Sequence, residues 1–365
     1  MTDEAYIDLC LALAKKGRGA ASPNPLVGCV VVKDGAIVGA GYHEKFGGPH
    51  AEINALDNAG DNARGAELFV NLEPCSHYGK TPPCADAIIE AGVKRVVVGV
   101  IDPNPLVSGK GVERLREAGI EIRTGVREER CKDINRFFFK RVSEGVPYVT
   151  LKIAQTLDGK IADRDGGSKW ITSATSRRMV HRLRSGYDAV LVGANTARAD
   201  DPRLTVRMTE GRDPLRIVID SRLRLRATLK CFTERGDRTV VLALNETKKK
   251  ARKIATLREL GVRVVHVRKA RDGGVDLKDA LKKIVGLGVN SLLVEGGAKI
   301  FTAFVVKELF DEIRIFAAPM FFGGGKSAIG DVGARSLREA KRLEVVEVER
   351  SGADVFIQMR KIDGG

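Results

Sequence analysis

The chain has 365 residues, a length that favours two domains over one, with 43% hydrophobic and 30% charged residues. This composition is typical of a globular protein with a solvated surface. The chain contains no apolar run long enough to cross a bilayer, so we expect no membrane span. Asp3 and Glu4 stand where a secretion signal would carry positive charge, so we expect a cytoplasmic location.

Basic residues outnumber acidic ones, 62 against 47, which gives a formal net charge of +15. Such a balance suits anionic partners, namely phosphorylated metabolites, nucleotides or nucleic acid. The basic residues are spread along the chain, and their densest run, Lys248 to Lys253, is typical of a solvated helix face. Aromatic residues make up only 5%, which argues against a base-stacking surface. We therefore expect small phosphorylated molecules as partners and no nucleic acid.

A disulfide framework is not expected in a cytosolic chain, so the six cysteines are interpreted one by one. Cys75 and Cys84 have surroundings that are polar, rich in turn residues and close to histidine. The others lie in apolar surroundings or lack a partner motif, and are interpreted as core or structural residues: Cys10, Cys29, Cys131 and Cys231.

Apolar periodicity and turn signals predict alternating helices and strands in the first half of the chain. Thr2 can cap the first helix, and an Asp34-Gly35 turn joins the two strands of a hairpin. This alternation predicts an α/β layered domain with a mixed sheet. In chain order we expect a helix ending at Gly17, strands over 27–32 and 37–42, a helix over 50–59, a strand over 67–72, a helix over 82–91, a strand over 95–101, a helix over 109–118 and a strand over 120–124.

One connecting helix is expected over 128–141, and Gly145-Val146-Pro147 then breaks the pattern. We place a domain boundary there, which gives domains over 1–146 and 147–365. The tail is predicted to form closing antiparallel strands over 313–318, 343–348 and 354–359. The second half also alternates, with strands predicted over 148–154, 189–192, 216–219, 239–244, 262–267 and 291–294, and helices over 175–184, 277–287 and 299–309.

His50 and Glu52 form a His-x-Glu motif, and Cys75 and Cys84 follow later in the same half. Catalytic zinc takes three protein ligands and keeps one position for water, and one histidine with two thiolates meets that count. The metal acidifies its water, and Glu52 can carry the proton of that water to a leaving amine without binding the metal. Zinc nucleobase deaminases carry this kind of signature. We therefore predict hydrolytic removal of an amino group from a pyrimidine-type ring.

Several alternatives stay open within this constellation. Positions 76–83 separate the two cysteines, whereas the general signature has only two residues there, so the cysteines could be unrelated core residues. His77 is a rival ligand that would complete a four-ligand structural site, although a substrate-facing role fits it equally well. His43 is either a satisfied structural histidine or a substrate contact, and we favour the contact. The turn over 102–105 could reach a ligand or be an ordinary Asx turn.

Three segments of the first half closely resemble the bifunctional riboflavin-biosynthesis deaminase/reductase family: residues 22–30, the His-Ala-Glu motif at 50–52, and residues 73–84. In that family the long insert between the two cysteines is normal. The resemblance continues in the second half, where residues 152–162 look like the start of the reductase domain. Residues 294–297, Val-Glu-Gly-Gly, look like its late glycine motif, so the match covers essentially the whole chain.

The resemblance implies a cytidine-deaminase-like three-layer α/β domain followed by a dihydrofolate-reductase-like α/β domain. The first, with Zn2+, would deaminate 2,5-diamino-6-(5-phosphoribosylamino)pyrimidin-4-one. The second, with NADPH, would reduce the ribosyl group of 5-amino-6-(5-phosphoribosylamino)uracil to a ribityl chain. The family also leads us to expect a homo-oligomer.

The resemblance also implies roles for individual residues. In the deaminase, Glu52 would be catalytic. The metal ligands would be His50, Cys75 and Cys84, and the substrate contacts Asn24, His43, Lys80, Asp102 and Asn104. In the reductase, the cofactor contacts would be Ala154, Trp170, Thr196, Asp200, Ser221, Gly297, Ala298, Lys299, Ile300, Phe301, Thr302 and Ala303. The reductase substrate contacts would be Ser168, Arg184, Leu204, Arg207 and Glu295.

Part of this assignment has support from the residues themselves. No Gly-x-Gly-x-x-Gly lies between a strand and a helix, so a Rossmann site is not supported. The glycine pair ending at Gly297 precedes a predicted helix whose first amides can hold a pyrophosphate. Arg184 and Arg207 can grip a phosphate with forked donors. Trp170 could cover a ligand ring or be a partly buried anchor, and residues 323–326 form either a phosphate loop or a flexible turn, of which we favour the turn.

Two hypotheses compete with a bifunctional enzyme. A nucleic-acid-modifying zinc deaminase with a C-terminal RNA-binding module is compatible with the basic composition. A non-catalytic protein with a structural zinc would need a fourth ligand.

Overall fold

The computed structural model describes residues 1–77, 82–105 and 107–362, and the chain divides into two compact units, Met1–Val146 and Pro147–Gly365. Within these residues no helix combines the length and the apolar character that a membrane crossing requires.

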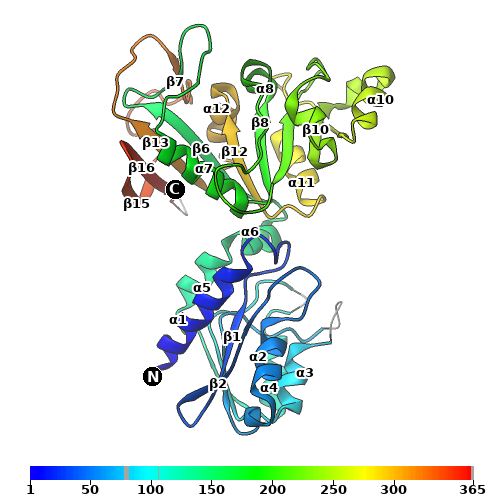
Figure 1. Ribbon diagram of the computed structural model, residues 1–365, viewed down its shortest axis with the longest axis vertical. Coiled ribbons are helices and arrows are strands. Elements are labelled where there is room, and N and C mark those ends of the chain that lie inside the picture. Colours follow the sequence, from blue (N-terminus) through cyan, green and yellow to red (C-terminus); the bar gives the residue numbers. More distant parts are fainter. Residues whose placement is uncertain (78–81, 106, 363–365) are drawn as a thin grey trace. The chain divides into compact units, whose positions relative to one another are not determined.

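The first unit has three layers, with helices on both faces of a five-stranded sheet (Figure 1). The strand order is β2-β1-β3-β4-β5, in which β1 is antiparallel to β2 and β3, whereas β3, β4 and β5 are parallel. Helices α1 and α5 cover one face, and α2, α3 and α4 cover the other (Figure 1), so the expected mixed sheet is confirmed. The elements are α1 (Asp3–Ala14), β1 (Gly28–Lys33), β2 (Ala36–Tyr42), α2 (Ala51–Ala59), β3 (Glu67–Val70), α3 (Cys84–Glu90), β4 (Arg95–Val98), α4 (Lys110–Glu117), β5 (Glu121–Thr124), α5 (Glu128–Ile134) and α6 (Arg136–Glu144).

Local sequence explains how this unit places the start of α2. Thr2 caps α1 by accepting a hydrogen bond from the Ala5 amide. Gly28 lets α1 approach β1 closely, because a Cβ at this position would lie 2.1 Å from the Cys10 carbonyl oxygen. The β1–β2 hairpin turns through Asp34 and Gly35, which both have positive φ. Helix α2 then packs against β2, so its first turn lies at the end of the sheet.

The connecting segment differs from the single helix expected over 128–141. It is split into α5 and α6 at Asn135, which is buried and has φ −102° and ψ 10°. The Asn135 side chain accepts a hydrogen bond from the Leu26 amide and donates one to the Leu26 carbonyl. The break therefore lets Asn135 bind the segment before β1. Local periodicity cannot predict this contact, because Leu26 lies far away in the sequence.

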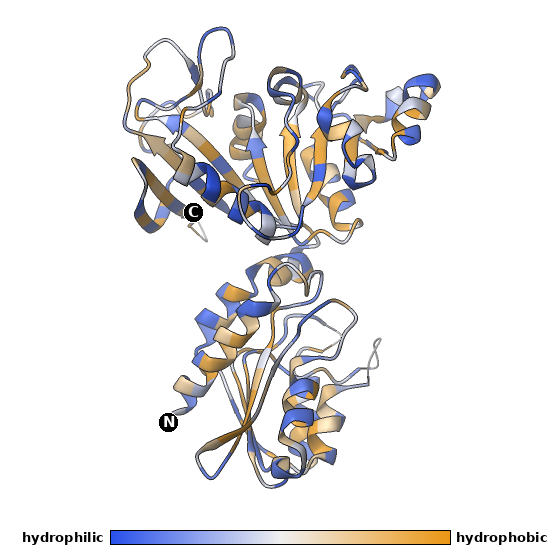
Figure 2. Ribbon diagram, in the orientation of Figure 1, coloured by the Kyte–Doolittle hydropathy of each residue, from blue (hydrophilic) through white to orange (hydrophobic). Residues whose placement is uncertain are grey.

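The second unit is an α/β domain with a nine-stranded sheet of order β11-β10-β9-β8-β12-β6-β13-β16-β15. Every neighbouring pair from β11 through β10, β9, β8, β12 and β6 to β13 is parallel. Strands β16 and β15 then extend the sheet through antiparallel pairs. The parallel strands are predominantly hydrophobic (Figure 2), and β8 and β10 are buried at every residue, as strands inside a parallel sheet are. The elements are β6 (Tyr148–Thr156), β7 (Lys160–Ala162), α7 (Ala174–Gly186), β8 (Ala189–Gly193), α8 (Ala194–Asp200), β9 (Leu215–Ile219), α9 (Lys230–Thr233), β10 (Thr239–Leu244), α10 (Ala251–Glu259), β11 (Arg263–Val267), α11 (Leu277–Val285), β12 (Ser291–Gly296), α12 (Ala298–Val306), β13 (Glu312–Ala318), β14 (Lys326–Ser327), β15 (Leu343–Ser351) and β16 (Asp354–Lys361).

Two expectations for this unit need correction. The tail was expected to be antiparallel throughout, but β13 pairs in parallel with β6 before β16 reverses direction. The basic run over 248–253 does not lie on one helix, because a 3-10 turn over Asn245–Lys249 precedes α10. The direction of β13 depends on its pairing with β6, which is distant in sequence. The 3-10 turn is held locally, because Thr247 Oγ1 donates to the Leu244 carbonyl and the Lys250 amide donates to the Thr247 carbonyl.

Candidate active sites

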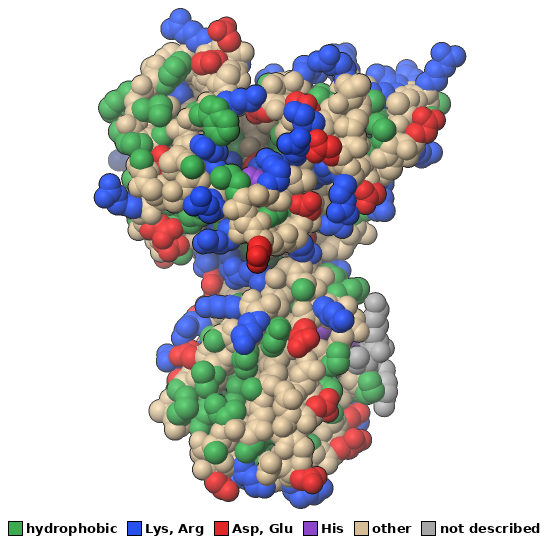
Figure 3. Space-filling model, in the orientation of Figure 1, with side chains coloured by type: hydrophobic (Ala, Val, Ile, Leu, Met, Phe, Trp, Pro, Cys, Tyr) green, Lys and Arg blue, Asp and Glu red, His purple; other side chains and the backbone are tan. Residues whose placement is uncertain are grey.

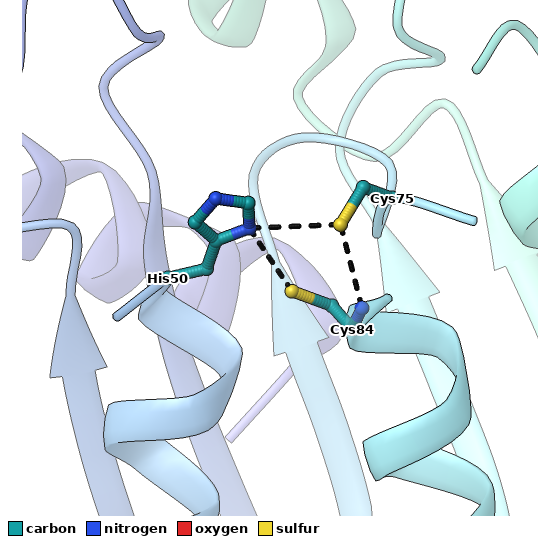
Figure 4. Close-up of side chains that lie close together, drawn as sticks. All are labelled: His50, Cys75 and Cys84. Atoms are coloured by element: carbon teal, nitrogen blue, oxygen red, sulfur yellow. Dashed lines mark hydrogen bonds between the residues drawn. The ribbon is translucent and has the colours of Figure 1, made fainter. Parts of the chain in front are cut away.

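His50, Cys75 and Cys84 converge on one point in the first unit (Figure 4). His50 is the N-cap of α2, Cys75 lies in the segment after β3, and Cys84 opens α3. His50 Nδ1 lies 3.1 Å from Cys84 Sγ and 3.6 Å from Cys75 Sγ. Tetrahedral zinc with ligands at roughly 2.0 to 2.3 Å needs donor atoms roughly 3.5 Å apart. The three side chains therefore fit a zinc ion, and the geometry contradicts the alternative of two unrelated core cysteines.

His77 does not join this cluster. The three ligand atoms of His50, Cys75 and Cys84 lie within 4.8 Å of one another, and among the residues that the structure describes no fourth ligand completes the group. The His77 side chain is exposed. A closed four-ligand structural site is thus not found in this part of the chain. Lys80, expected to contact substrate, lies outside the described residues.

Glu52 lies in the first turn of α2, close to the ligand cluster. It is 3% exposed, and within the described chain its Oε2 atom has no hydrogen-bond partner. Burial raises the pKa of Glu52 to about 7. Hydrogen bonds with Cys84 and His50 lower the pKa of Cys75 to about 4, whereas the same bond and burial raise the pKa of Cys84. A thiolate, an imidazole and a carboxylate that can exchange a proton near neutral pH are the groups a hydrolytic zinc site requires.

His43 connects the cluster to Asn24. Its Nδ1 lies 2.9 Å from the Pro49 carbonyl and its Nε2 lies 3.1 Å from Asn24 Nδ2. The Asn24 amide therefore donates to Nε2, and His43 carries its proton on Nδ1. The ring stands edge-on to His50, with 5.4 Å between centroids. Both ring nitrogens of His43 thus already have hydrogen-bond partners, as the structural role requires. A polar contact between His43 and substrate would require its hydrogen bond with Asn24 to break.

Asp102 and Asn104 follow β4. The Asn104 amide donates to Asp102 Oδ1 at 2.8 Å, so the segment is an Asx turn. Asp102 is 6% exposed, and burial raises its pKa to about 6. The charge of His77 opposes that rise.

In the second unit, the expected cofactor contacts gather at the ends of adjacent strands. Ala154 lies in β6, Thr196 lies in α8 directly after β8, Ser221 follows β9, and Gly297 follows β12. These strands are neighbours in the order β9-β8-β12-β6 and are parallel, so their carboxyl ends open on one edge of the sheet. A Cβ at Gly297, which has φ 90°, would lie 2.9 Å from Thr196 Oγ1. Glycine is therefore needed where α12 begins.

Arg184 and Glu295 form a buried ion pair near the same edge. Arg184 Nε and Nη2 donate to the two Glu295 oxygens at 2.5 and 2.8 Å, and Nη1 donates to the Thr205 carbonyl at 3.0 Å. Burial opposes ionisation of Glu295, but Arg184 and Lys152 lower its pKa to about 2. The forked donors expected to grip a phosphate are thus engaged with a protein carboxylate in this structure.

Two members of this buried cluster were not anticipated from the sequence. Lys152 Nζ lies 3.6 Å from Glu295 Oε2, and burial lowers the pKa of Lys152. His181 Nδ1 accepts a hydrogen bond from the Arg207 amide at 3.0 Å, and burial together with Arg184 lowers its pKa to about 4. The sequence did hold signals for both residues. Lys152 is a charged residue inside an otherwise uncharged strand, and His181 lies one turn before Arg184 on the same helix.

The remaining expected contacts lie in loops. Trp170 is 71% exposed with φ 70° and stacks against the Arg177 guanidinium at 4.3 Å, so a partly buried anchor is wrong and the ring remains accessible to a ligand. Ser168 Oγ donates to Asp200 Oδ1 at 2.9 Å. Leu204 is buried with φ 57°.

Residues 323–325 bend the backbone directly before β14. The amides of Phe322 and Gly323 donate to the Asp158 carboxylate at 3.1 and 2.7 Å, and Lys326 opens β14, which pairs with β7. A protein carboxylate thus accepts from the first amide that a phosphate loop over 323–326 would use.

These features define a class of protein: a zinc-type deaminase joined in one chain to an α/β reductase. Residues 1–100 match the cytidine and deoxycytidylate deaminase zinc-binding region, and residues 147–357 match the RibD C-terminal domain. The riboflavin biosynthesis protein RibD of Aquifex aeolicus is 49% identical over 98% of this chain and 98% of its own length. RibD of Escherichia coli is 38% identical over 98% and 99%.

Solved structures of RibD proteins are similar to this chain over its whole length. RibD of Acinetobacter baumannii, at 36% identity, superposes with a TM-score of 0.90 over 99% of both chains. The deaminase/reductase of Thermotoga maritima, at 41% identity, superposes with a TM-score of 0.86 over 99% of both. The chain therefore belongs to the RibD family, and it is a bifunctional deaminase and reductase of riboflavin biosynthesis.

The reductase match leaves the RNA-binding module without support. Consistent with this, Lys and Arg side chains are interspersed with Asp and Glu on the face shown in Figure 3.

Proposed function

We propose that residues 1–146 deaminate 2,5-diamino-6-(5-phosphoribosylamino)pyrimidin-4-one and that residues 147–365 reduce the ribosyl group of 5-amino-6-(5-phosphoribosylamino)uracil with NADPH. The Thermotoga maritima relative is named as the deaminase and reductase for these compounds. The single observation that carries the first assignment is the convergence of His50, Cys75 and Cys84 beside a carboxylate oxygen of Glu52 with no partner in the described chain.

In the first unit, His50, Cys75 and Cys84 would hold the zinc ion, which supplies water activation when bound. Glu52 takes up a proton at its buried carboxylate and delivers it to the leaving amine. Its pKa of about 7 suits both transfers near neutral pH. Asn24, which His43 holds through a hydrogen bond, would contact the pyrimidine ring.

The turn at Asp102 and Asn104 would supply further polar contacts with the pyrimidine. Buried polar groups of this kind hold one orientation of a substrate, because a misplaced ring leaves them unpaired.

In the second unit, the carboxyl edge of the parallel strands would hold NADPH. The segment from Gly297 to Ala303, which is the N-cap and the first two turns of α12, would lie around its phosphates. The amides at the start of the helix would be the donors, and Trp170 would cover a ring. Arg207 would bind the substrate phosphate. Arg207 is exposed, and its Nη1 donates a hydrogen bond to Thr205 Oγ1. Among the described residues no partner is found for its other guanidinium donors, which can therefore face solvent or ligand. Comparing kcat/KM with NADPH and with NADH tests the cofactor choice.

The decisive experiment assays both steps in the purified full chain with zinc and NADPH. Glu52→Ala should abolish ammonia release while zinc content and reduction of the uracil intermediate stay at wild-type levels. Cys84→Ser should lose zinc as well as deamination, again without affecting reduction. A folded Glu52→Ala variant that loses both steps would overturn the division between the two units.

We further propose that the chain works as a homo-oligomer in the cytoplasm. Strand β15 is an edge strand of the sheet, and Val345, Val346 and Val348 on it are exposed, Val348 by 61%. An unpaired edge with apolar side chains favours cover by a second copy of the chain. Light scattering should give a mass above that of one chain, and Val348→Lys should reduce it.

A further inference from the structure

Glu73 is a buried carboxylate that accepts hydrogen bonds from four backbone amides. It follows β3 and is 3% exposed. Its Oε2 accepts from Asp102 at 3.2 Å and from Gly109 at 2.9 Å, and its Oε1 accepts from Gly111 at 2.9 Å and from Val112 at 3.2 Å. Burying a carboxylate is costly unless such charge-assisted bonds replace its water, and these four do so.

The four amides stand at the two ends of one loop. Asp102 lies in the segment after β4, whereas Gly109, Gly111 and Val112 belong to the N-terminal end of α4. The carboxylate therefore joins Asp102 to the N-terminal end of α4, and the positive end of the α4 dipole favours its charge. The same loop carries Asp102 and Asn104, linked by their Asx turn.

A second contact joins Glu73's segment to α4. A Cβ at Gly111 would lie 1.9 Å from the Pro74 carbonyl oxygen, so the first turn of α4 rests directly on the backbone between Glu73 and Cys75. Cys75 Sγ in turn lies 3.6 Å from His50 Nδ1. Three consecutive residues thus connect the metal ligands on one side with the 102–112 loop on the other.

We propose that Glu73 is a positioning residue that sets the distance between the metal cluster and the substrate-contacting turn at Asp102 and Asn104. This inference rests on the proposed substrate contacts of that turn. Glu73 acts through the loop, and the charge matters because four donors need two acceptor oxygens. In Glu73→Gln one acceptor oxygen would remain, and the other would be replaced by an NH2 group. Two backbone amides would then face a donor instead of an acceptor.

The test is Glu73→Gln in the full-length zinc-loaded enzyme. We expect KM for deamination to rise by roughly tenfold or more while kcat stays within roughly threefold, because zinc and Glu52 are untouched. Zinc content and reduction of the uracil intermediate should match the wild type. Glu117→Gln, an exposed position on α4, is the matched control and should change neither constant.

Hydrogen exchange and two further variants, Gly111→Ala and Asp102→Asn, distinguish the possible outcomes. Hydrogen exchange of residues 102–112 should be faster in Glu73→Gln, and Gly111→Ala should give the same rise in KM. Unchanged KM with unchanged exchange, equal losses in kcat and kcat/KM, or loss of zinc would each overturn the proposal. If Asp102→Asn leaves KM unchanged, the substrate contact is wrong, and the exchange data alone then decide whether Glu73 holds the loop.

Discussion

Replacing Glu295 with glutamine should destabilise the second unit by about 3 kcal/mol or more, because removing one partner of a buried ion pair leaves the other charge uncompensated. The side chains of Arg184 and Glu295 are 12% and 5% exposed. The lowered pKa has the same sign: a shift from 4.5 to about 2 corresponds to a preference of about 3 kcal/mol for the ionised form of Glu295 in the folded chain.

The same shift gives the sign of the pH dependence. Glu295 has a folded-state pKa below its unfolded value, so its contribution is complete above about pH 4.5 and is lost as pH falls through about 2. The wild type should therefore lose this stabilisation between those two pH values. Glu295→Gln never has it, so the difference between the two proteins should shrink over that window.

Differential scanning calorimetry of the full chain measures this effect. The transition that moves on zinc chelation belongs to the first unit, and the other transition reports on the second. A loss of about 3 kcal/mol should lower that second unfolding temperature by roughly 6 to 12 °C for a unit of this size. Glu308→Gln, which breaks an exposed pair with Lys341, is the matched control and should leave it unchanged. A Glu295→Gln shift no larger than the control's would refute the reasoning.

Three further predictions concern the separate units. A chelator that removes zinc should stop ammonia release while reduction of the uracil intermediate continues, and loss of both would contradict two independent sites. Arg207→Ala should raise the reductase KM for its phosphorylated substrate by roughly tenfold with deamination unchanged, and an unchanged KM would place the phosphate elsewhere. Gly28→Ala should destabilise the first unit by about 3 kcal/mol or more, measured by urea unfolding, because its Cβ would meet the Cys10 carbonyl at 2.1 Å. A change within about 0.5 kcal/mol would mean that α1 can shift freely.

Much of the fold follows from local sequence. The Asp34-Gly35 turn, the Thr2 cap and the apolar strand runs each depend on neighbours within a few residues, and the structure has elements at those places. The metal ligands were also recognisable, because histidine, two cysteines and a nearby glutamate are the residue types that zinc hydrolysis needs. Family resemblance then turned an unusual spacing between Cys75 and Cys84 into a specific expectation.

The polar contacts that position both sites depend on the tertiary structure. Arg184 and Glu295 are separated by 111 positions, so the sequence could not show that the arginine fork is already engaged. Asn135 breaks a helix to hold Leu26, 109 positions away, and β13 takes its direction from β6. The chemistry of the chain can be predicted from its residue types and their order, because side-chain type limits reactivity. Only the folded chain decided which buried groups pair, because Glu73, Glu295 and Asn135 satisfy their hydrogen bonds with segments that come together when the sheets form.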